Sequence, residues 1–469
     1  MASEQTRIES DSMGQMQVPG WALWGAQTQR AVENFPVSGY RFGRRFIRAM
    51  GLIKQAAAEV NRELGLLDEQ RAGWMVAAAQ EVVDGKLDEH FPIDIYQTGS
   101  ATSTNMNANE VIANRAIQLA GGKVGSRDPV HPNDPVNMGQ SSNDVIPAAI
   151  HVALAEALRQ DLAPALEAMA RQLDEKACKF WNIIKIGRTH LQDATPIRLG
   201  QEFSGYAAQA RLSGQRALRA VAALRELPIG GTAVGTGINT HVEFGSRVAR
   251  RLSEQTGIEF AEAANHFEAQ AAKDAVCEAG GILRAIAVSM TKIANDIRWL
   301  ASGPRCGIGE IRIPSTQPGS SIMPGKVNPV MSEMLIQVAA QVIANDTAVT
   351  IGGRDSIFEL NTMMPLIAHN VLESVRLLTA AVGVFTRRCI EGIEPDAERC
   401  GQMIEQSLAM CTSLAPRIGY DQAAAIAKEA YAGGRTVRQV VAAKAVLPES
   451  ELNTVLDPSA MTAPGGGKE

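Results

Sequence analysis

The stretch ILRAIAVSMTKIANDIRWL, residues 282–300, decides the fold class of this chain. Its apolar residues recur at intervals of three or four, which places them on one face of an α-helix. They are Ile282, Ile286, Met290, Ile293, Ile297 and Leu300. The pattern stops at Ser302-Gly303-Pro304, residues that end helices. The stretch therefore predicts one long helix with a continuous apolar seam.

Four other segments have helical patterns of comparable length, and few segments alternate as strands do. They cover residues 145–179, 199–227, 330–351 and 356–388. The first contains Pro164, where we expect a kink. Aromatic residues make up only 4% of the chain, which suits close antiparallel helix packing. The sequence predicts a mainly α fold built around a long helical bundle.

The regions outside the predicted helical bundle have different sequence patterns. Residues 14–47 contain several glycines and prolines and predict an irregular arm, whereas residues 46–84 predict packing helices with a break near Gly65. The last part of the chain predicts shorter helices and a disordered glycine-rich tail. Gly230–Gly237, GGTAVGTG, lacks the preceding strand of a dinucleotide fingerprint and predicts a loop between helices.

The composition excludes several classes of function. The 45 lysines and arginines against 50 aspartates and glutamates give a net charge of −5, which offers no basic surface for nucleic acid or membrane. The six cysteines have no C-x-x-C spacing, so neither a disulfide framework nor a zinc site is indicated. The N-terminus lacks the features of a signal peptide, and no apolar run reaches the roughly 18 residues of a membrane span. We expect a soluble, cytoplasmic protein whose partner is small or another copy of itself.

Residues 319–329, GSSIMPGKVNP, predict a loop because their glycines and prolines cannot continue a helix. The loop carries two hydroxyls, one ammonium (Lys326) and one amide (Asn328). Asn328-Pro329 is typical of a helix start, so we expect an N-cap at Asn328 and helix amides that point at the loop. Such a helix end attracts anions. A nucleotide P-loop is excluded because Val327, not Ser or Thr, follows Lys326.

Three further stretches are rich in polar side chains. Residues 98–107, TGSATSTNMN, predict a loop because short hydroxyl and amide side chains compete for backbone hydrogen bonds. Residues 141–143, SSN, lie where the N-cap of the next helix belongs. Residues 187–196, GRTHLQDATP, contain a lone histidine, His190, a residue that is more often structural than catalytic.

These stretches together resemble the signature regions of the fumarase/aspartase superfamily of lyases. Residues 319–329 are similar to its GSSxMPxKxNP loop, residues 98–107 to TGSGTSSNMN, and residues 187–196 to GxTHxQxAxP. Ala101 replaces a glycine of the second pattern. The resemblance implies a three-domain fold with minor β structure in the N-terminal domain, and domains at residues 1–141, 142–394 and 395–469. It also implies a homotetramer whose active sites are each shared by three subunits, with no cofactor and no metal.

Within the superfamily, His190 and Gly325 favour the fumarases, since aspartases commonly have glutamine and alanine at these positions. The resemblance implies reversible hydration of fumarate to (S)-malate in the tricarboxylic acid cycle, by anti elimination and addition through an aci-carboxylate. The substrate is then a small dicarboxylate. An ammonia lyase acting on aspartate and a catalytically silent helical scaffold are the alternatives.

The resemblance also assigns roles to residues. Ser320 is the base that takes a proton from carbon, and its alkoxide requires stabilisation by Lys326 and nearby amide hydrogens. His190 acts on the leaving hydroxyl through a bound water, with Glu333 as its carboxylate partner; locally, Glu333 equally suits a carboxylate at a helix N-terminus. The substrate-binding set is Ser100, Ala101, Thr102, Ser141, Ser142, Asn143, Thr189, Ser321, Lys326, Val327 and Asn328.

A second, non-catalytic anion site is implied by the stretch HPND, which comprises His131, Pro132, Asn133 and Asp134. In the family this site usually includes a nearby basic residue. Asp128 occupies that place here and Arg127 lies beside it, so the sequence leaves the use of this site open.

Overall fold

A computed structural model describes residues 6–466. Residues 1–5, part of the N-terminus without signal-peptide features, and residues 467–469 of the glycine-rich tail lie outside the described residues. The chain forms two compact units. The first comprises the described residues through Pro164 with Gly214–Ala287 and Ala339–Thr379, and the second comprises Ala165–Ser213, Val288–Val338 and the described residues from Ala380 onward.

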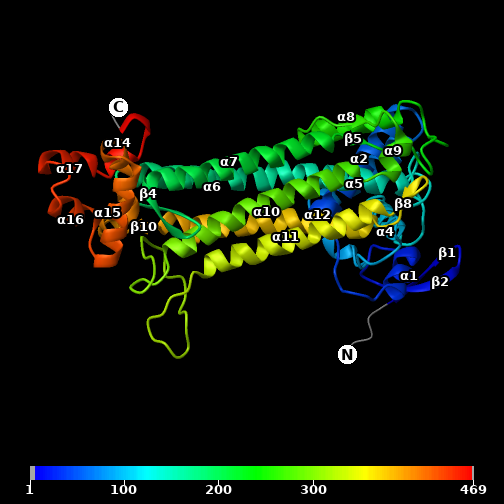
Figure 1. Ribbon diagram of the computed structural model, residues 1–469. Helices are drawn as coiled ribbons and strands as arrows, with labels where there is room; N and C mark the ends of the chain where they lie inside the picture. Colours follow the sequence, from blue (N-terminus) through cyan, green and yellow to red (C-terminus); the bar gives the residue numbers. More distant parts are fainter. Residues whose placement is uncertain (1–5, 467–469) are drawn as a thin grey trace. The chain divides into compact units, whose positions relative to one another are not determined.

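Helix is the dominant structure, as the fold class predicts (Figure 1). The long helices are α6 (Ala163–Lys179), α7 (Leu199–Ala223), α10 (Asp274–Leu300), α11 (Val330–Arg354) and α12 (Met364–Arg388). The predicted seam of α10 is buried from Ile286 to Leu300, and Leu283 rather than Ile282 is its buried residue at the start. The long-helix prediction for residues 282–300 is therefore confirmed.

Polar contacts fix the long helices against one another within each unit. In the first unit, Arg284 of α10 pairs with Asp346 of α11 at 2.6 Å, and Asn345 of α11 donates to the Ser374 hydroxyl of α12 at 3.1 Å. In the second unit, the Tyr206 hydroxyl of α7 donates to Asp296 of α10 at 3.0 Å. Small residues permit the close approach, since a Cβ at Gly280 would lie 2.7 Å from Asp346.

The remaining α-helices are mostly shorter. They are α1 (Ala26–Asn34), α2 (Arg44–Glu63), α3 (Glu69–Val83), α4 (Thr102–Leu119), α5 (Ser142–Glu156), α8 (Phe244–Thr256), α9 (His266–Ala271), α13 (Ala397–Gln406), α14 (Ala415–Ile418), α15 (Tyr420–Gly433), α16 (Val437–Ala443) and α17 (Glu449–Val455). Short stretches of 3-10 helix are η1 (Asp88–His90), η3 (Ile390–Gly392), η4 (Leu408–Ser413), η5 (Ser459–Met461) and η6 (Pro464–Gly466). Helices α13 to α17 enclose an apolar cluster of their own that includes Ile404, Leu414 and Val440.

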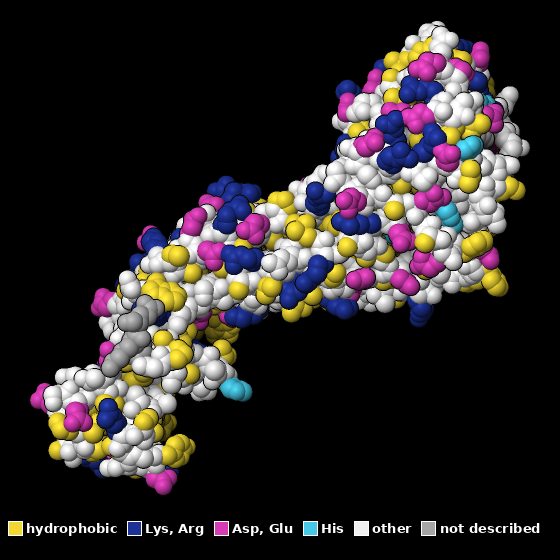
Figure 2. Space-filling model, turned by 90° about the horizontal axis from the view of Figure 1, so that it is seen from above, with side chains coloured by type: hydrophobic (Ala, Val, Ile, Leu, Met, Phe, Trp, Pro, Cys, Tyr) yellow, Lys and Arg dark blue, Asp and Glu magenta, His cyan; other side chains and the backbone are white. Residues whose placement is uncertain are grey.

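In the described part of the chain, strands are few and each pairs with one other strand. The antiparallel pairs are β1 (Thr6–Asp11) with β2 (Gly14–Pro19), β3 (Ile184–Thr189) with β4 (Gln192–Arg198), β7 (Ile311–Arg312) with β10 (Glu394–Pro395), and β8 (Ser356–Ile357) with β9 (Leu360–Asn361). The pair β5 (Glu226–Leu227) and β6 (Ala261–Glu262) is parallel. On the face that Figure 2 shows, side chains of both charges are mixed, in keeping with the near balance of the composition.

Several local predictions are wrong. The segment 14–47 is not an irregular arm throughout, because it contains β2, α1 and the start of α2. The helix predicted for residues 356–388 begins only at Met364, because Asn361 accepts the backbone N–H of Met363 after the β8–β9 hairpin. The helix predicted for residues 199–227 ends at Ala223, and the tail residues Pro464–Gly466 form a turn.

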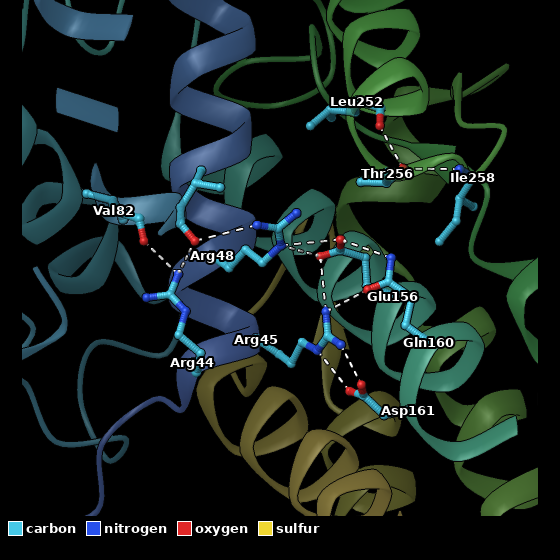
Figure 3. A network of polar contacts seen from close by, with 11 residues as sticks. Arg44, Arg45, Arg48, Val82, Glu156, Gln160, Asp161, Leu252, Thr256 and Ile258 are labelled. Carbon is cyan, nitrogen blue, oxygen red and sulfur yellow. Dashed lines mark hydrogen bonds and ion pairs between the residues drawn. The ribbon is translucent and has the colours of Figure 1, made fainter. Parts of the chain in front are cut away.

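The kink expected at Pro164 takes the form of a π-helical segment, η2 (Ala157–Leu162), between α5 and α6. Proline offers no N–H and its ring excludes the carbonyl four residues earlier, so a widened turn is a natural result. Two arginines of α2 hold this segment: Arg45 donates to Asp161 and Gln160, and Arg48 donates to Glu156 at 3.3 Å (Figure 3).

Among the described residues, α11 is the one helix long and apolar enough to span a membrane by length and composition. Only 33% of its most apolar window is buried within this chain. Its Asn345 and Asp346 form the polar contacts with α12 and α10 given above. Length and composition alone are weak evidence for a membrane span, because core helices of soluble proteins have the same features.

Candidate active site

Two helix starts meet in the first unit and bring four predicted substrate-binding residues together. The Ser100 hydroxyl lies 2.7 Å from that of Thr102, and the Thr102 hydroxyl lies 2.8 Å from that of Ser142. The Ser142 hydroxyl in turn donates to the Asn143 amide oxygen at 3.3 Å. Residues forty positions apart in sequence thus form one continuous row of neutral donors and acceptors at the N-termini of α4 and α5. We call this row the hydroxyl cluster.

The prediction of a loop for residues 98–107 is wrong in its second half, because α4 begins at Thr102. Tertiary hydrogen bonds override the low helix propensity of its amide residues. The Asn107 side chain donates to the His90 carbonyl at 2.9 Å, and the Asn105 side chain donates to the Asn137 side chain at 3.2 Å. The side-chain nitrogens of both residues thus find acceptors while the backbone stays helical, whereas Asn105 Oδ1 is buried without a hydrogen-bond partner in the described residues.

The backbone conformation at Ala101 explains why the family usually has glycine at this position. Its φ is 54°, in the left-handed region that disfavours a Cβ, and its side chain is fully buried. Gly99, two positions earlier, is required for a different reason, since a Cβ there would lie 2.0 Å from the Thr362 carbonyl oxygen. The backbone of α4 therefore starts from a tight, partly strained turn.

Ser141 is the N-cap of α5, as predicted, and it forms a capping box with Asp144. Asp144 also accepts the backbone N–H groups of Gly230 at 3.2 Å and Thr232 at 2.9 Å. Asn143 donates to the Ala233 carbonyl at 2.8 Å. The glycine-rich loop 230–237 is therefore part of the site, which sequence reasoning missed; its signal was the Ser-x-x-Asp spacing together with the GGTAVGTG motif.

Two buried titratable groups, Asp144 and Lys54, interact electrostatically next to the start of α5. Burial raises the pKa of Asp144 to about 7 despite its backbone donors, and burial lowers the pKa of Lys54 to about 7. The Lys54 ammonium donates to the Gln140 side chain at 2.9 Å and to the Asn137 side chain at 3.1 Å. Lys54 thus supports the turn that leads into Ser141, a role that sequence reasoning did not identify.

The second unit contains the loop of residues 319–329, and backbone contacts close it at its base. Gly319 N–H donates to the Lys326 carbonyl at 2.8 Å, and the Asn328 side chain donates to the Gly319 carbonyl at 2.8 Å. A Cβ at Gly319 would lie 2.6 Å from the Lys326 carbonyl oxygen, so only glycine fits. The prediction of Asn328 as N-cap is wrong: α11 begins at Val330, and the Asn328 side chain closes the loop instead.

Within this loop, Ser320 Oγ accepts two backbone hydrogen bonds, from Ile322 N–H at 3.2 Å and Met323 N–H at 3.0 Å. Two amide hydrogens directed at one hydroxyl oxygen stabilise negative charge on that oxygen. Ser320 and Lys326 line the same open hollow, which has a volume of 500 Å³. Glu333 lies in the first turn of α11, the end of the helix dipole that favours a negative charge.

His190 lies on a different element, the exposed turn of the β3–β4 hairpin. Thr189 is opposite Gln192, so His190 and Leu191 form a two-residue turn. Their φ angles are 57° and 61°, the combination found in type I′ turns. In residues 6–466, no hydrogen bond or ion pair joins His190 to Ser320, Lys326 or Glu333 of the same chain.

The HPND stretch lines a cavity of 120 Å³ in the first unit. Its lining includes Arg127, His131, Pro132 and Asn133, whereas Asp128 and Asp134 are not among the lining residues. Three carboxylates, from Glu9, Asp11 and Glu110, also face this cavity. The basic residue present is therefore Arg127, but it is outnumbered by acids.

The fold and the polar loops define a lyase, and comparisons with known proteins agree. The model of the lyase family matches residues 14–344, and that of the fumarase C C-terminus matches residues 410–463. Class II fumarate hydratase from Halobacterium salinarum is 55% identical over 99% of this chain and 98% of its own length. That from Nitrosomonas europaea is 52% identical over 98% of this chain and 99% of its own.

Structure comparison gives the same result. The crystal structure of class II fumarase from Schistosoma mansoni superimposes with a TM-score of 0.95 and 35% identity, over 98% of this chain and all of that one. This chain belongs to the class II fumarate hydratase family. The predicted family and the predicted fold class are confirmed, and the ammonia-lyase alternative is not favoured.

Proposed function

We propose that the protein catalyses the reversible hydration of fumarate to (S)-malate, as its relatives' names imply. The observation that carries the proposal is Ser320, whose Oγ accepts two backbone N–H groups within a glycine-closed loop that also bears Lys326. A serine is a poor base unless its alkoxide is stabilised, and two amides and a nearby ammonium supply that stabilisation.

The proposed dehydration begins when the Ser320 alkoxide takes a proton from the carbon beside one carboxylate of malate. The electron pair left on carbon delocalises into that carboxylate and forms an aci-carboxylate. Lys326, Asn328 and the loop amides stabilise the added charge. The C–O bond on the neighbouring carbon then breaks with anti geometry, and His190, partnered by Glu333, protonates the departing hydroxide through a water.

The hydroxyl cluster is suited to orienting the two carboxylates of the substrate. Ser100, Thr102, Ser142 and Asn143 offer neutral donors at two helix starts, an environment that favours carboxylates without neutralising them. Ser141 caps one of those helices, and Ala101 shapes the start of the other. Thr189, Ser321 and Val327 complete the proposed substrate-binding set.

We further propose a homotetramer in which three subunits contribute to each active site, cytoplasmic, metal-independent and acting in the tricarboxylic acid cycle. Sharing between subunits is supported by the separation of His190 and Ser320 on elements that no polar contact joins in residues 6–466. The 120 Å³ cavity beside His131 and Arg127 is proposed as the second anion site, although its three carboxylates make it a weak one.

A direct assay tests the proposed function. The conjugated double bond of fumarate absorbs ultraviolet light, so product formation is followed from (S)-malate and from aspartate in parallel. We expect absorbance to rise with malate and to stay flat with aspartate. A rise with aspartate alone would indicate an ammonia lyase, and a folded tetramer that is inert to both would indicate a silent scaffold.

A further inference from the structure

The turn that carries His190 has a strained backbone. Type I′ turns need positive φ at both central residues and normally use asparagine and glycine there, whereas this turn has His190 and Leu191. Both side chains are exposed in the single chain, so no packing within the chain holds the turn in place. Within the chain, the contacts that fix the turn are therefore those at the base of the hairpin.

A buried cluster of charges anchors that base. Glu310, which is fully buried, lies 3.1 Å from the Lys185 ammonium, and both of its carboxylate oxygens lie 3.0 Å from Arg188 Nη1. Lys185 is also buried and donates to a second carboxylate, Glu202 of α7, at 3.0 Å. Two cations and two carboxylates are therefore balanced, which a buried ionic cluster requires. Both cations belong to β3, and Arg188 precedes His190 by only two positions.

Glu310 is itself rigidly held through its backbone. Its N–H donates to the Leu300 carbonyl at the end of α10 at 2.9 Å, and its carbonyl accepts from Asp396 N–H at 2.8 Å. The next residue, Ile311, pairs with Pro395 in the β7–β10 ladder. Glu310 thus connects the end of α10, through its backbone N–H, to β3, through its carboxylate. Strand β3 leads directly into His190.

We propose that Glu310, acting through Lys185 and Arg188, is a positioning residue for His190 in the hydration reaction. This inference rests on the proposed function. The cluster fixes the strand below the strained turn, so that the imidazole is presented in one orientation. It acts only through His190 and carries no proton of the reaction.

A double-mutant cycle on malate dehydration tests the inference. Glu310→Gln keeps the shape of the side chain and removes its charge. We expect kcat to fall about tenfold with KM within about twofold, because the loss is in positioning the group that acts on the leaving hydroxyl. In a His190→Asn background the same change should lower kcat by less than about twofold, because the residue being positioned is gone. Arg188→Met, whose side chain is partly exposed, should reproduce the pattern if Glu310→Gln does not fold.

Lys176→Met is the matched control. Its buried ammonium donates to the carbonyls of Glu391 and Ile393 in the same unit, and not to the hairpin. It should lower the thermal midpoint and leave kcat unchanged. Equal fold losses in both His190 backgrounds, or an unchanged kcat for Glu310→Gln and Arg188→Met, would overturn the inference while the proposed function stands. A parent protein that does not dehydrate malate would overturn both.

Discussion

At the scale of the residue, the site depends on a few backbone conformations that most side chains avoid. Ala101, His190 and Leu191 all have positive φ, and each adjoins a group assigned to substrate binding or catalysis. Strained backbone persists where surrounding contacts impose it, and such positions cluster at functional sites. The family's usual glycine at position 101 therefore has a conformational explanation.

Ala101→Gly should leave the free energy of unfolding nearly unchanged, whereas Ala108→Gly should lower it. The left-handed conformation costs an L-residue about 1–2 kcal/mol, which glycine relieves, and the greater freedom of glycine in the unfolded chain offsets about 0.5–1 kcal/mol of that gain. Loss of the buried Ala101 methyl group, about 0.8 kcal/mol, offsets most of the remainder. Ala108 is equally buried in the interior of α4 and has no such strain to relieve, so it is the matched control. Equal losses in the two variants, measured by urea unfolding, would contradict the strain argument.

At the scale of the element, the 319–329 loop holds the Ser320 hydroxyl in place without regular secondary structure. Its two ends are joined by the Gly319 and Asn328 hydrogen bonds, and Ser320 receives amides from residues two and three positions later. Only glycine fits at position 319, because a Cβ there would clash with the Lys326 carbonyl oxygen.

Gly319→Ala should lower kcat/KM for malate by at least about tenfold, because a Cβ 2.6 Å from the Lys326 carbonyl forces the loop base apart and misplaces the donors around Ser320. The thermal midpoint should change little, since the loop is exposed. Gly401→Ala, where nothing lies within 4 Å of the added Cβ, is the control and should retain full activity. Normal activity in Gly319→Ala would show that loop closure is dispensable.

Helix α5 carries a buried histidine that links stability to pH. Burial, and next the nearby Lys273, lower the pKa of His151 to about 4, and its Nδ1 lies 2.9 Å from the Glu226 carbonyl. The folded state therefore binds this proton less readily than the unfolded chain, so the stabilising contribution is complete above pH 6.5 and is lost as pH falls toward 4. The slope should approach about 1.4 kcal/mol per pH unit, and denaturant unfolding from pH 7 to 4 measures it. In His151→Gln this part of the slope should disappear; an unchanged slope would exclude His151 as its source.

At the scale of the whole molecule, sequence reasoning reached the fold class, the family and the polar stretches, because apolar periodicity and signature loops are local properties. Sequence reasoning failed where tertiary contacts determine the local conformation or the role of a side chain. The helical conformation of Asn105 and Asn107 depends on acceptors far away in the chain, and the loop-closing role of Asn328 depends on Gly319. Lys54 and Glu310 could not be identified because their partners are distant in sequence, whereas Asp144 had a local signal in its Ser-x-x-Asp spacing. The predicted domain boundaries and residue roles remain predictions.

The proposed association of four chains is also a property of the whole molecule. Helix α11 leaves apolar side chains such as Ile343 and Ile351 exposed in the single chain, which suits burial between subunits. Light scattering should give a mass of about 200 kDa, four times 50.0 kDa. Ile343→Asp should lower that mass and abolish activity together, whereas Leu119→Asp, an exposed apolar residue at the end of α4, should leave both unchanged. An active monomer would contradict sites shared between subunits.

The most direct test of the central claim is the rate of malate dehydration in Ser320→Ala, compared with Ser321→Ala. Loss of the stabilised Oγ should lower kcat by at least about a thousandfold, because no other group in the loop can replace the base. Ser321→Ala should affect mainly KM, as a substrate-binding change. A Ser320→Ala enzyme with kcat within tenfold of the parent would contradict the account.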